Sequence, residues 1–373
     1  RGIHTHTHML QWLASCVWAH RGLVCGGAAL LYVGAAAVLW WFPQWVHPRE
    51  VQQRVHRMRS HPQWGDTLAR HKLMVCHRGG SQEGRENTMR AFRHAVQCGA
   101  DGLELDVCLT RDKKVVVVHD AILDRLTGKD VRVADLDYDE LPPLQDGHLL
   151  HFPEELGQRY SCPQDQDLRI PLLEEVFEAF PGVVINIECK QYTEELVDEL
   201  WNVINKHNRQ GTVVWGCARD NISELCYRKD PSIPVFCPTN FVFRILAGFL
   251  LGFLPFMRFH FDYFEVPFPT IGLHHNAVNE MGKEVYERSW VMRIKFWLIK
   301  NVLNSSWMYG HMRRRGIVVI PWVVNSMEDV NKCFELGADG VVTDCPQGLA
   351  DYIHQWRPQK RGDPPLFFAE MTS

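Results

Sequence analysis

The chain has 373 residues, of which 46% are hydrophobic, enough for one large core or for two domains of ordinary size. Its net charge of -4 provides no basic field for a nucleic acid, and its aromatic residues do not cluster with lysines as in base-stacking surfaces. The twelve cysteines are scattered singly without any CxxC pair, which is typical of reduced core residues. These properties argue against a nucleic-acid partner and against a disulfide scaffold.

A long uncharged segment lies near the start of the chain, at residues 23–46. A helix of this length rises far enough to cross a hydrocarbon layer of about 30 Å. A cleaved signal peptide is the alternative, but the apolar run is longer than usual for one, and its small residues lie within the run. We therefore expect an N-terminal tail at 1–22, a transmembrane helix at 23–46, and an integral membrane protein.

The segment after the expected helix, 47–71, forms a basic linker with four arginines between residues 49 and 59. The opposite flank offers only Arg1 and Arg21 close by. Because positive charge favours the cytosolic side of a membrane, we expect the main domain to face the cytosol from the endoplasmic reticulum or another endomembrane.

Short β-branched runs alternate with longer stretches of helical periodicity from residue 72 to residue 356. This alternation is typical of parallel strands joined by helices and predicts a distorted TIM (β/α)8 barrel. The link at 108–114 is too short for a crossover helix, so one unit of the barrel must be irregular. The predicted strands lie at 73–76, 102–107, 115–119, 183–188, 212–217, 234–237, 317–324 and 340–343.

Two insertions interrupt this alternation. Residues 121–170 are rich in Asp, Pro and Gln with little periodicity, which predicts a cap or loop beside the site. Residues 241–312 include the uncharged run 245–257, which is too short to cross a bilayer as a straight helix. We expect a membrane-associated insertion there, with a buried barrel helix as the alternative. The last residues, 357–373, are expected to be a disordered tail.

Acidic side chains occupy two of the predicted strands. Glu104 and Asp106 are two residues apart, so the period of a strand turns both carboxylates to one face. Glu188 ends another strand. Buried acids are costly unless a positive group neutralises them, and three carboxylates favour a hard ion over zinc. The sequence therefore predicts one divalent cation, Mg²⁺ or Ca²⁺, held by Glu104, Asp106 and Glu188.

Two histidines and two cationic side chains accompany these acids at strand ends. His77 and His119 carry imidazoles, whose pKa suits proton transfer, and Arg78 and Lys190 can donate hydrogen bonds to phosphate oxygens. Each residue alone has an ordinary explanation, such as a hydrogen-bonded core histidine or a solvated charged face. Their convergence at the strand ends, where barrel sites are built, favours phosphodiester cleavage.

The same residues belong to an ordered series of motifs that resembles the glycerophosphodiester phosphodiesterase domain over about 72–353. The series comprises His77-Arg-Gly-Gly80, Glu86-Asn87-Thr88, Glu104-Leu-Asp106, His119-Asp120, Asn186-Ile-Glu188-Cys-Lys190, Pro321-Trp322-Val-Val-Asn325 and the segment 337–344.

The resemblance implies a distorted TIM barrel with an insertion after the third strand, a metal on the three carboxylates, and the two histidines as an acid/base pair. It also implies that the substrate meets Arg78, Lys190, Trp322 and Asn87. The apolar segments look like the animal membrane branch of the family, whose members act as lysophospholipase D enzymes.

The expected activity is therefore the metal-dependent hydrolysis of lysophospholipids to lysophosphatidic acid and an alcohol such as choline or ethanolamine, with N-acyl ethanolamine from related precursors as a further product. The expected partners are the lysophospholipid or glycerophosphodiester substrate and the lipid bilayer. Two alternatives remain: an enzyme for water-soluble glycerophosphodiesters that gives glycerol 3-phosphate, and a non-catalytic lipid-binding module. The second would be expected to lack at least one carboxylate or histidine of the set, and all five are present.

Overall fold

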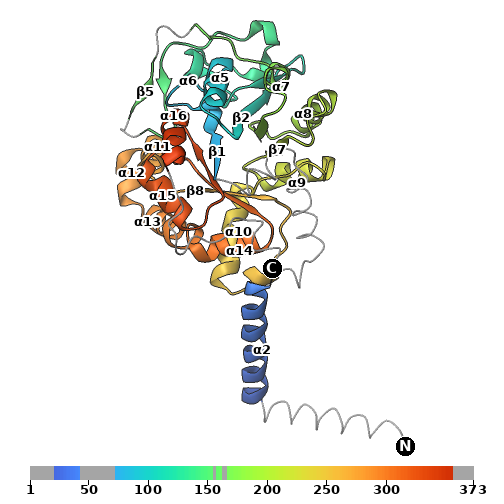
Figure 1. The fold of residues 1–373 in the computed structure, drawn as a ribbon, viewed down its shortest axis with the longest axis vertical. Helices are drawn as coiled ribbons and strands as arrows, with labels where there is room; N and C mark the ends of the chain where they lie inside the picture. The colour runs from blue at the N-terminus through green and yellow to red at the C-terminus, as the bar shows by residue number, and fades with distance from the viewer. Residues whose placement is uncertain (1–20, 43–71, 154–156, 162–165, 356–373) are drawn as a thin grey trace, which may run out of the picture.

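A computed structural model describes residues 21–42, 72–153, 157–161 and 166–355 of the chain. It consists of a central sheet of mainly parallel strands surrounded by helices, with one helix projecting from one end (Figure 1). The strands are β1 (Leu73–Cys76), β2 (Gly102–Leu109), β3 (Val115–Val117), β4 (His148–Leu149), β5 (Arg159–Tyr160), β6 (Val184–Cys189), β7 (Val213–Gly216), β8 (Tyr263–Pro267), β9 (Val318–Trp322) and β10 (Gly340–Thr343).

Most of the helices lie between consecutive strands and cover the outside of the sheet (Figure 1). They are α2 (Arg21–Trp41), α5 (Met89–Gln97), α6 (Asp124–Thr127), α7 (Leu173–Ala179), α8 (Glu194–Lys206), α9 (Asp220–Lys229), α10 (Thr239–Leu250), α11 (Ile271–Met281), α12 (Lys283–Arg288), α13 (Trp290–Leu298), α14 (Ser306–Arg314), α15 (Met327–Glu335) and α16 (Pro346–Gln355). Short single turns are η2 (His77–Gly79), η3 (Val133–Asp135), η4 (Tyr138–Glu140), η5 (Leu254–Phe256) and the π-turn η6 (Ile299–Leu303).

The parallel strands close into a barrel. The order β10-β1-β2-β6-β7 forms one path, and β8 pairs in parallel with β9. Bridges from Trp215 to Val235 and from Phe236 to Tyr263 join β7 to β8 through the segment 235–236. A backbone hydrogen bond of 2.8 Å from Val324 to Val342 joins the other end of this sheet to β10. Seven strands and the 235–236 segment thus make a TIM-like barrel of eight parallel segments.

Two predicted elements have a different role in the structure. The run at 115–119 forms β3, which pairs antiparallel with β2, so the short link is the turn of a hairpin. The barrel strand that the prediction lacks is β8, which lies inside the predicted insertion at 241–312. That range therefore contains part of the barrel as well as α10 to α14. Helix α10 buries Val242 and Ile245 and exposes Phe243, so it is a barrel helix with an exposed apolar face.

The alternation of side chains along the strands divides the core into two parts. Leu73 and Val75 of β1 belong to a cluster inside the barrel, whereas Met74 and Cys76 pack outward against the helices. On β2 the outward positions are Leu103, Leu105 and Val107, so Glu104 and Asp106 point into the barrel. The interior is thus apolar near the start of β1 and polar toward the strand ends.

The described residues contain no helix that is both long and apolar enough to cross a membrane. This finding contradicts the prediction of an integral membrane protein whose main domain faces the cytosol from an endomembrane. The transmembrane helix predicted at 23–46 is not confirmed over its described part, residues 23–42. Nine of the 21 residues of α2 are Gly or Ala, which add little apolar surface per residue. Residues 43–46, the linker and the expected tail at 357–373 lie outside the described residues, as does nearly all of the N-terminal tail.

The end of α2 packs on the barrel, where apolar contacts take up part of its surface. The ring of Trp40 stacks on that of His311 in α14 at 4.3 Å. Tyr32 stacks on Phe256 at 5.6 Å, and its hydroxyl donates a hydrogen bond of 2.9 Å to the carbonyl of Gly252. Helix α2 thus makes specific contacts with α14 and with the turn η5.

Candidate active site

His77 and Arg78 directly follow β1, in the turn η2, which requires glycine at its end. Arg78 has a φ of 51°, and Gly79 and Gly80 have φ values of 82° and 99°, which favour glycine. A Cβ on Gly79 would lie 2.8 Å from the ring of Phe92, and one on Gly80 would lie 2.4 Å from Pro346. This tight turn directs the backbone N–H of Arg78 at Glu104, to which it donates a hydrogen bond of 2.9 Å.

The three predicted carboxylates come together. Asp106 of β2 is the register partner of Glu188 on β6, and Glu104 precedes Asp106 by two residues on the same face. Each of the three offers an oxygen atom, and these atoms lie within 4.8 Å of one another. Glu104 and Asp106 are buried and Glu188 is half-buried. This donor set consists only of carboxylate oxygens, which suits a hard divalent cation.

The surrounding charges shift the pKa values of Glu104 and Asp106 in opposite directions. Burial opposes the ionisation of Asp106, but the positive charges of Lys190 at 3.1 Å and Arg78 at 3.2 Å lower the pKa of this carboxyl below its ordinary value. Burial and the neighbouring Asp106 raise the pKa of Glu104 well above the ordinary value. The positive charges around Glu104 are thus too weak to favour its ionised form. A bound divalent cation would provide the missing positive charge.

Two other side-chain groups among the described residues could also offer metal ligands. Glu83, His94 and Cys98 form a half-buried cluster outside this pocket. His119, Asp120 and His151 form another group, which borders the pocket. Both contain nitrogen or sulfur donors, which suit softer transition metals.

Each predicted histidine is held by an aspartate. The Nδ1 atom of His77 lies 2.7 Å from Asp344, and that of His119 lies 2.6 Å from Asp120. An ionised aspartate accepts a hydrogen bond from Nδ1–H, so the Nε2 atom of each imidazole remains available to a substrate. Burial lowers the pKa of His119 well below its ordinary value, and Arg78 and Lys190 add to this effect. The free site therefore holds a neutral His119 at neutral pH.

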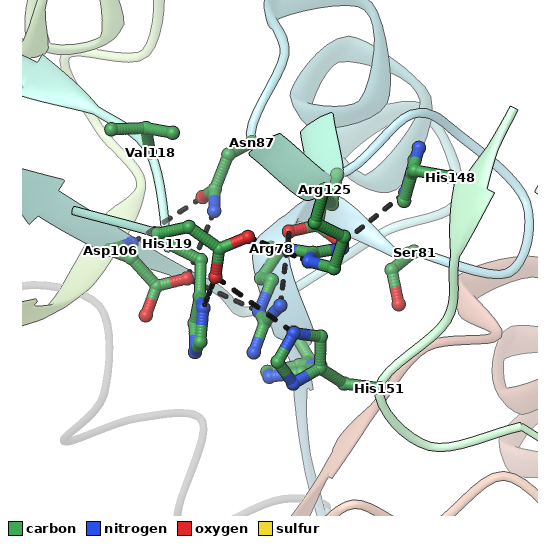
Figure 2. Close-up of polar contacts among 12 residues, drawn as sticks. Arg78, Ser81, Asn87, Asp106, Val118, His119, Arg125, His148 and His151 are labelled. Atoms are coloured by element: carbon green, nitrogen blue, oxygen red, sulfur yellow. Dashed lines mark hydrogen bonds and ion pairs between the residues drawn. The ribbon is translucent and has the colours of Figure 1, made fainter. Parts of the chain in front are cut away.

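The sequence indicated no role for the two aspartates or their supports. Ser81 and Asn325 donate hydrogen bonds to Asp344, and Arg125 donates one of 2.6 Å to Asp120. Figure 2 shows His119, Asp106 and Arg78 directed toward a common space. Asp344 directly follows β10, so its position at a strand end could have marked it as a candidate site residue.

Most of the predicted site residues line one cavity of about 270 Å³ at the ends of the strands. Asn87 and Asp106 are not among the residues that line it; Asn87 donates a hydrogen bond of 2.9 Å to Asp106 and thus lies behind the carboxylates. The substrate contact of Asn87 remains a prediction. The predicted residues in the wall are His77, Arg78, Glu104, His119, Glu188, Lys190 and Trp322.

The rest of the wall includes residues that the sequence did not indicate. His151 and Phe152 come from the insertion at 121–170, and Asn276 and Glu280 come from α11. Glu265 of β8 accepts a hydrogen bond of 2.9 Å from Asn186, and its burial raises its pKa to about 8. A cavity with an acidic cluster, two oriented imidazoles and two cations can bind an anionic phosphodiester and transfer protons to and from its oxygens.

Comparisons with known proteins agree with this geometry. Residues 77–231 match the Glycerophosphoryl diester phosphodiesterase family. The chain is 39% identical to the human protein Lysophospholipase D GDPD1 over 76% of this chain and 86% of that one, and 31% identical to the mouse protein Lysophospholipase D GDPD3 over 75% and 81%.

Solved structures share the fold at low sequence identity. A glycerophosphoryl diester phosphodiesterase structure from Silicibacter pomeroyi matches with a TM-score of 0.56 at 17% identity, over 81% of this chain and 97% of that one. An Oleispira antarctica phosphodiesterase, solved with its product sn-glycerol-3-phosphate, matches with a TM-score of 0.51 at 19% identity, over 76% and 97%.

Proposed function

The chain belongs to the glycerophosphoryl diester phosphodiesterase family and is a phosphoric diester hydrolase, and from this premise we propose that it is a divalent-metal-dependent lysophospholipase D. Its products would be lysophosphatidic acid and an alcohol such as choline or ethanolamine. The observation that carries the proposal is the carboxylate group of Glu104, Asp106 and Glu188 beside two aspartate-held histidines.

These three carboxylates would hold one Mg²⁺ or Ca²⁺ ion. Bound there, the ion would polarise a phosphoryl oxygen and lower the pKa of the attacking hydroxyl. Lys190 and Arg78 line the same cavity and add positive charge on the phosphoryl side. Trp322 forms another part of the wall, where it would contact the glycerol portion.

The two histidines divide the proton transfers. The Nε2 atom of His77 lies 4.0 Å from Glu104, so His77 is the residue beside the proposed cation. His77 removes the proton from the glycerol 2-hydroxyl, whose oxygen attacks phosphorus as the bond to the headgroup oxygen breaks. His119 donates a proton to that departing oxygen, and water then opens the cyclic phosphate.

The negative charge of the substrate helps His119 in this role. Burial and the two nearby cations keep the imidazole neutral in the free site. A phosphodiester anion beside the ring favours the protonated form and offsets part of this effect. His119 thus gains its proton together with the bound substrate.

An apolar surface next to the cavity favours an acylated substrate over a water-soluble one. The ring of His274 in α11 stacks on Phe296 of α13 at 3.9 Å, and α11 lines the cavity through Asn276 and Glu280. This surface would contact lipid and guide an acyl chain toward the cavity. Its exposed residues are Ile271, Met281, Val285, Trp290, Val291, Ile294 and Trp297.

The named activities of the relatives point the same way. The human and mouse relatives described above are named lysophospholipase D, and the Oleispira antarctica phosphodiesterase was solved in complex with its product sn-glycerol-3-phosphate. Lysophosphatidic acid contains the same glycerol phosphate unit with an acyl chain added.

The substrate class is tested by comparing lysophosphatidylcholine with glycerophosphocholine on one purified sample. We expect kcat/KM to be at least about tenfold higher for the lysolipid, because burial of even part of an acyl chain contributes more than 1.4 kcal/mol. A higher kcat/KM for glycerophosphocholine would contradict the proposal and support the enzyme for soluble diesters.

The exposed tryptophans provide a second measurement. We expect the double substitution Trp290→Ser and Trp297→Ser to raise KM for lysophosphatidylcholine about three- to tenfold, because the lipid-contacting surface becomes smaller. Hydrolysis of glycerophosphocholine should be unchanged, since both side chains are exposed on α13. An equal effect on both substrates would count against a lipid contact at this surface.

A further inference from the structure

A third histidine, His151, lies in the cavity beside the two that the sequence predicted. It follows β4 by two residues and belongs to the insertion at 121–170. The centroid of its ring lies 4.5 Å from that of His119, with the two rings edge to face (Figure 2). In the proposed reaction His77 and His119 transfer the protons, and His151 has no role.

The contacts around His151 place the ring but leave its nitrogen atoms available. Its Nε2 atom is 4.0 Å from Asp120, beyond hydrogen-bonding distance. Asp120 already accepts two hydrogen bonds of 2.6 Å, one from Arg125 and one from His119. In the described part of the chain the ring of His151 makes no hydrogen bond, and its side chain is 24% exposed toward the cavity.

The neighbouring residue fixes which part of the cavity His151 faces. The ring of Phe152 lies 5.6 Å from His77 and 6.0 Å from Trp322. Phe152 is therefore next to the proposed base and the glycerol portion of the substrate. His151 is next to His119, which places it on the side from which the headgroup departs.

His151 is neutral at neutral pH. Burial, followed by the charges of Arg78 and Arg125, lowers its pKa to about 3. A neutral imidazole can donate or accept a hydrogen bond, and it does not repel an ammonium headgroup as Lys or Arg would at the same place.

We propose that His151 contacts the leaving alcohol and donates a hydrogen bond to the headgroup oxygen as its bond to phosphorus breaks. This inference rests on the proposed function, in which His119 protonates the same oxygen. Because the two rings are adjacent, an oxygen bound at His119 is also within reach of a donor on His151. The insertion at 121–170 would thereby supply contacts to both ends of the substrate, through His151 and Phe152.

The test uses two substrates that differ only in the leaving group. Lysophosphatidylcholine needs stabilisation of its departing oxygen, whereas a lysophosphatidyl ester of p-nitrophenol releases an anion that is stable by itself. His151→Phe keeps a ring beside His119 but removes both nitrogen atoms. We expect it to lower kcat/KM about ten- to a hundredfold on the choline substrate, as for the loss of a hydrogen bond to a charged group, and less than about threefold on the nitrophenyl ester.

Two further variants complete the experiment. His151→Gln retains an N–H donor, and we expect it to recover most of the activity on the choline substrate. His207→Phe makes the same exchange at the C-terminal cap of α8, away from the cavity, and both activities should remain unchanged. If His151→Phe does not fold, His151→Ala allows the same comparison of substrates.

Equal losses on the two substrates would overturn the proposal, because His151 would then act on the phosphoryl group or on the fold. Unchanged hydrolysis of the choline substrate by His151→Phe would also overturn it. A wild-type protein that hydrolyses neither substrate would instead contradict the proposed function, so the two failures can be distinguished.

Discussion

Replacing Glu104 with Gln is expected to lower kcat by about 10³-fold or more, equivalent to at least about 4 kcal/mol of transition-state stabilisation. Glu104 is buried, and burial together with Asp106 makes its ionised form unfavourable without a cation. The amide has nearly the same shape but no charge to hold a metal. The measurement is kcat on lysophosphatidylcholine, combined with the affinity for Mg²⁺ or Ca²⁺, which should fall in parallel.

The matched control is Glu335→Gln. Glu335 is the last residue of α15, and it accepts a hydrogen bond from Asn331 at an exposed position. We expect this variant to keep its activity and metal affinity, because the substitution removes one charge far from the cavity. Substantial turnover by Glu104→Gln at unchanged metal affinity would refute the assignment of Glu104 as a ligand.

Replacing His119 with Gln is expected to lower kcat on lysophosphatidylcholine by about 10²- to 10⁴-fold, the usual contribution of general acid catalysis. Gln has no titratable proton to donate to the departing oxygen. On the nitrophenyl ester the loss should shrink to about tenfold or less, because that leaving group departs without a proton. The unfolding midpoint should change little, because the amide can still donate a hydrogen bond to Asp120.

His77→Gln distinguishes the two histidines. His77 is proposed to remove the proton from the attacking hydroxyl, a step that both substrates need. We expect its loss of activity to be similar on the two esters. A reversal of this pattern, with His77 sensitive to the leaving group and His119 insensitive, would exchange their roles.

Much of the barrel was predictable because buried strands are marked by short β-branched runs. The runs at 73–76 and 340–343 coincide with β1 and β10. Strand β8 was missed because Tyr263–Pro267 was grouped with the other apolar runs of the predicted insertion, and a short apolar run alone does not distinguish a strand from a helix. The run at 115–119 has the composition of a barrel strand, but its pairing is decided by the short link that forces a hairpin with β2.

The carboxylates were predictable from strand periodicity, since Glu104 and Asp106 must share a face. His151 and Phe152 were not, because the insertion at 121–170 has no periodicity and its path over the rim depends on tertiary contacts. One of these is the 3.2 Å approach of His275 to the carbonyl of Pro153. The interpretation of 23–46 relied on length and absence of charge, and Gly and Ala, which are nine of the 21 residues of α2, are uncharged without being strongly apolar.

The most direct test of the central claim is metal removal and return. Protein stripped with a chelator and verified metal-free should show no measurable hydrolysis of lysophosphatidylcholine. Adding Mg²⁺ or Ca²⁺ should restore activity in proportion to the binding of one ion per chain, with lysophosphatidic acid and choline released in equal amounts. Full activity in the verified metal-free protein would contradict the account.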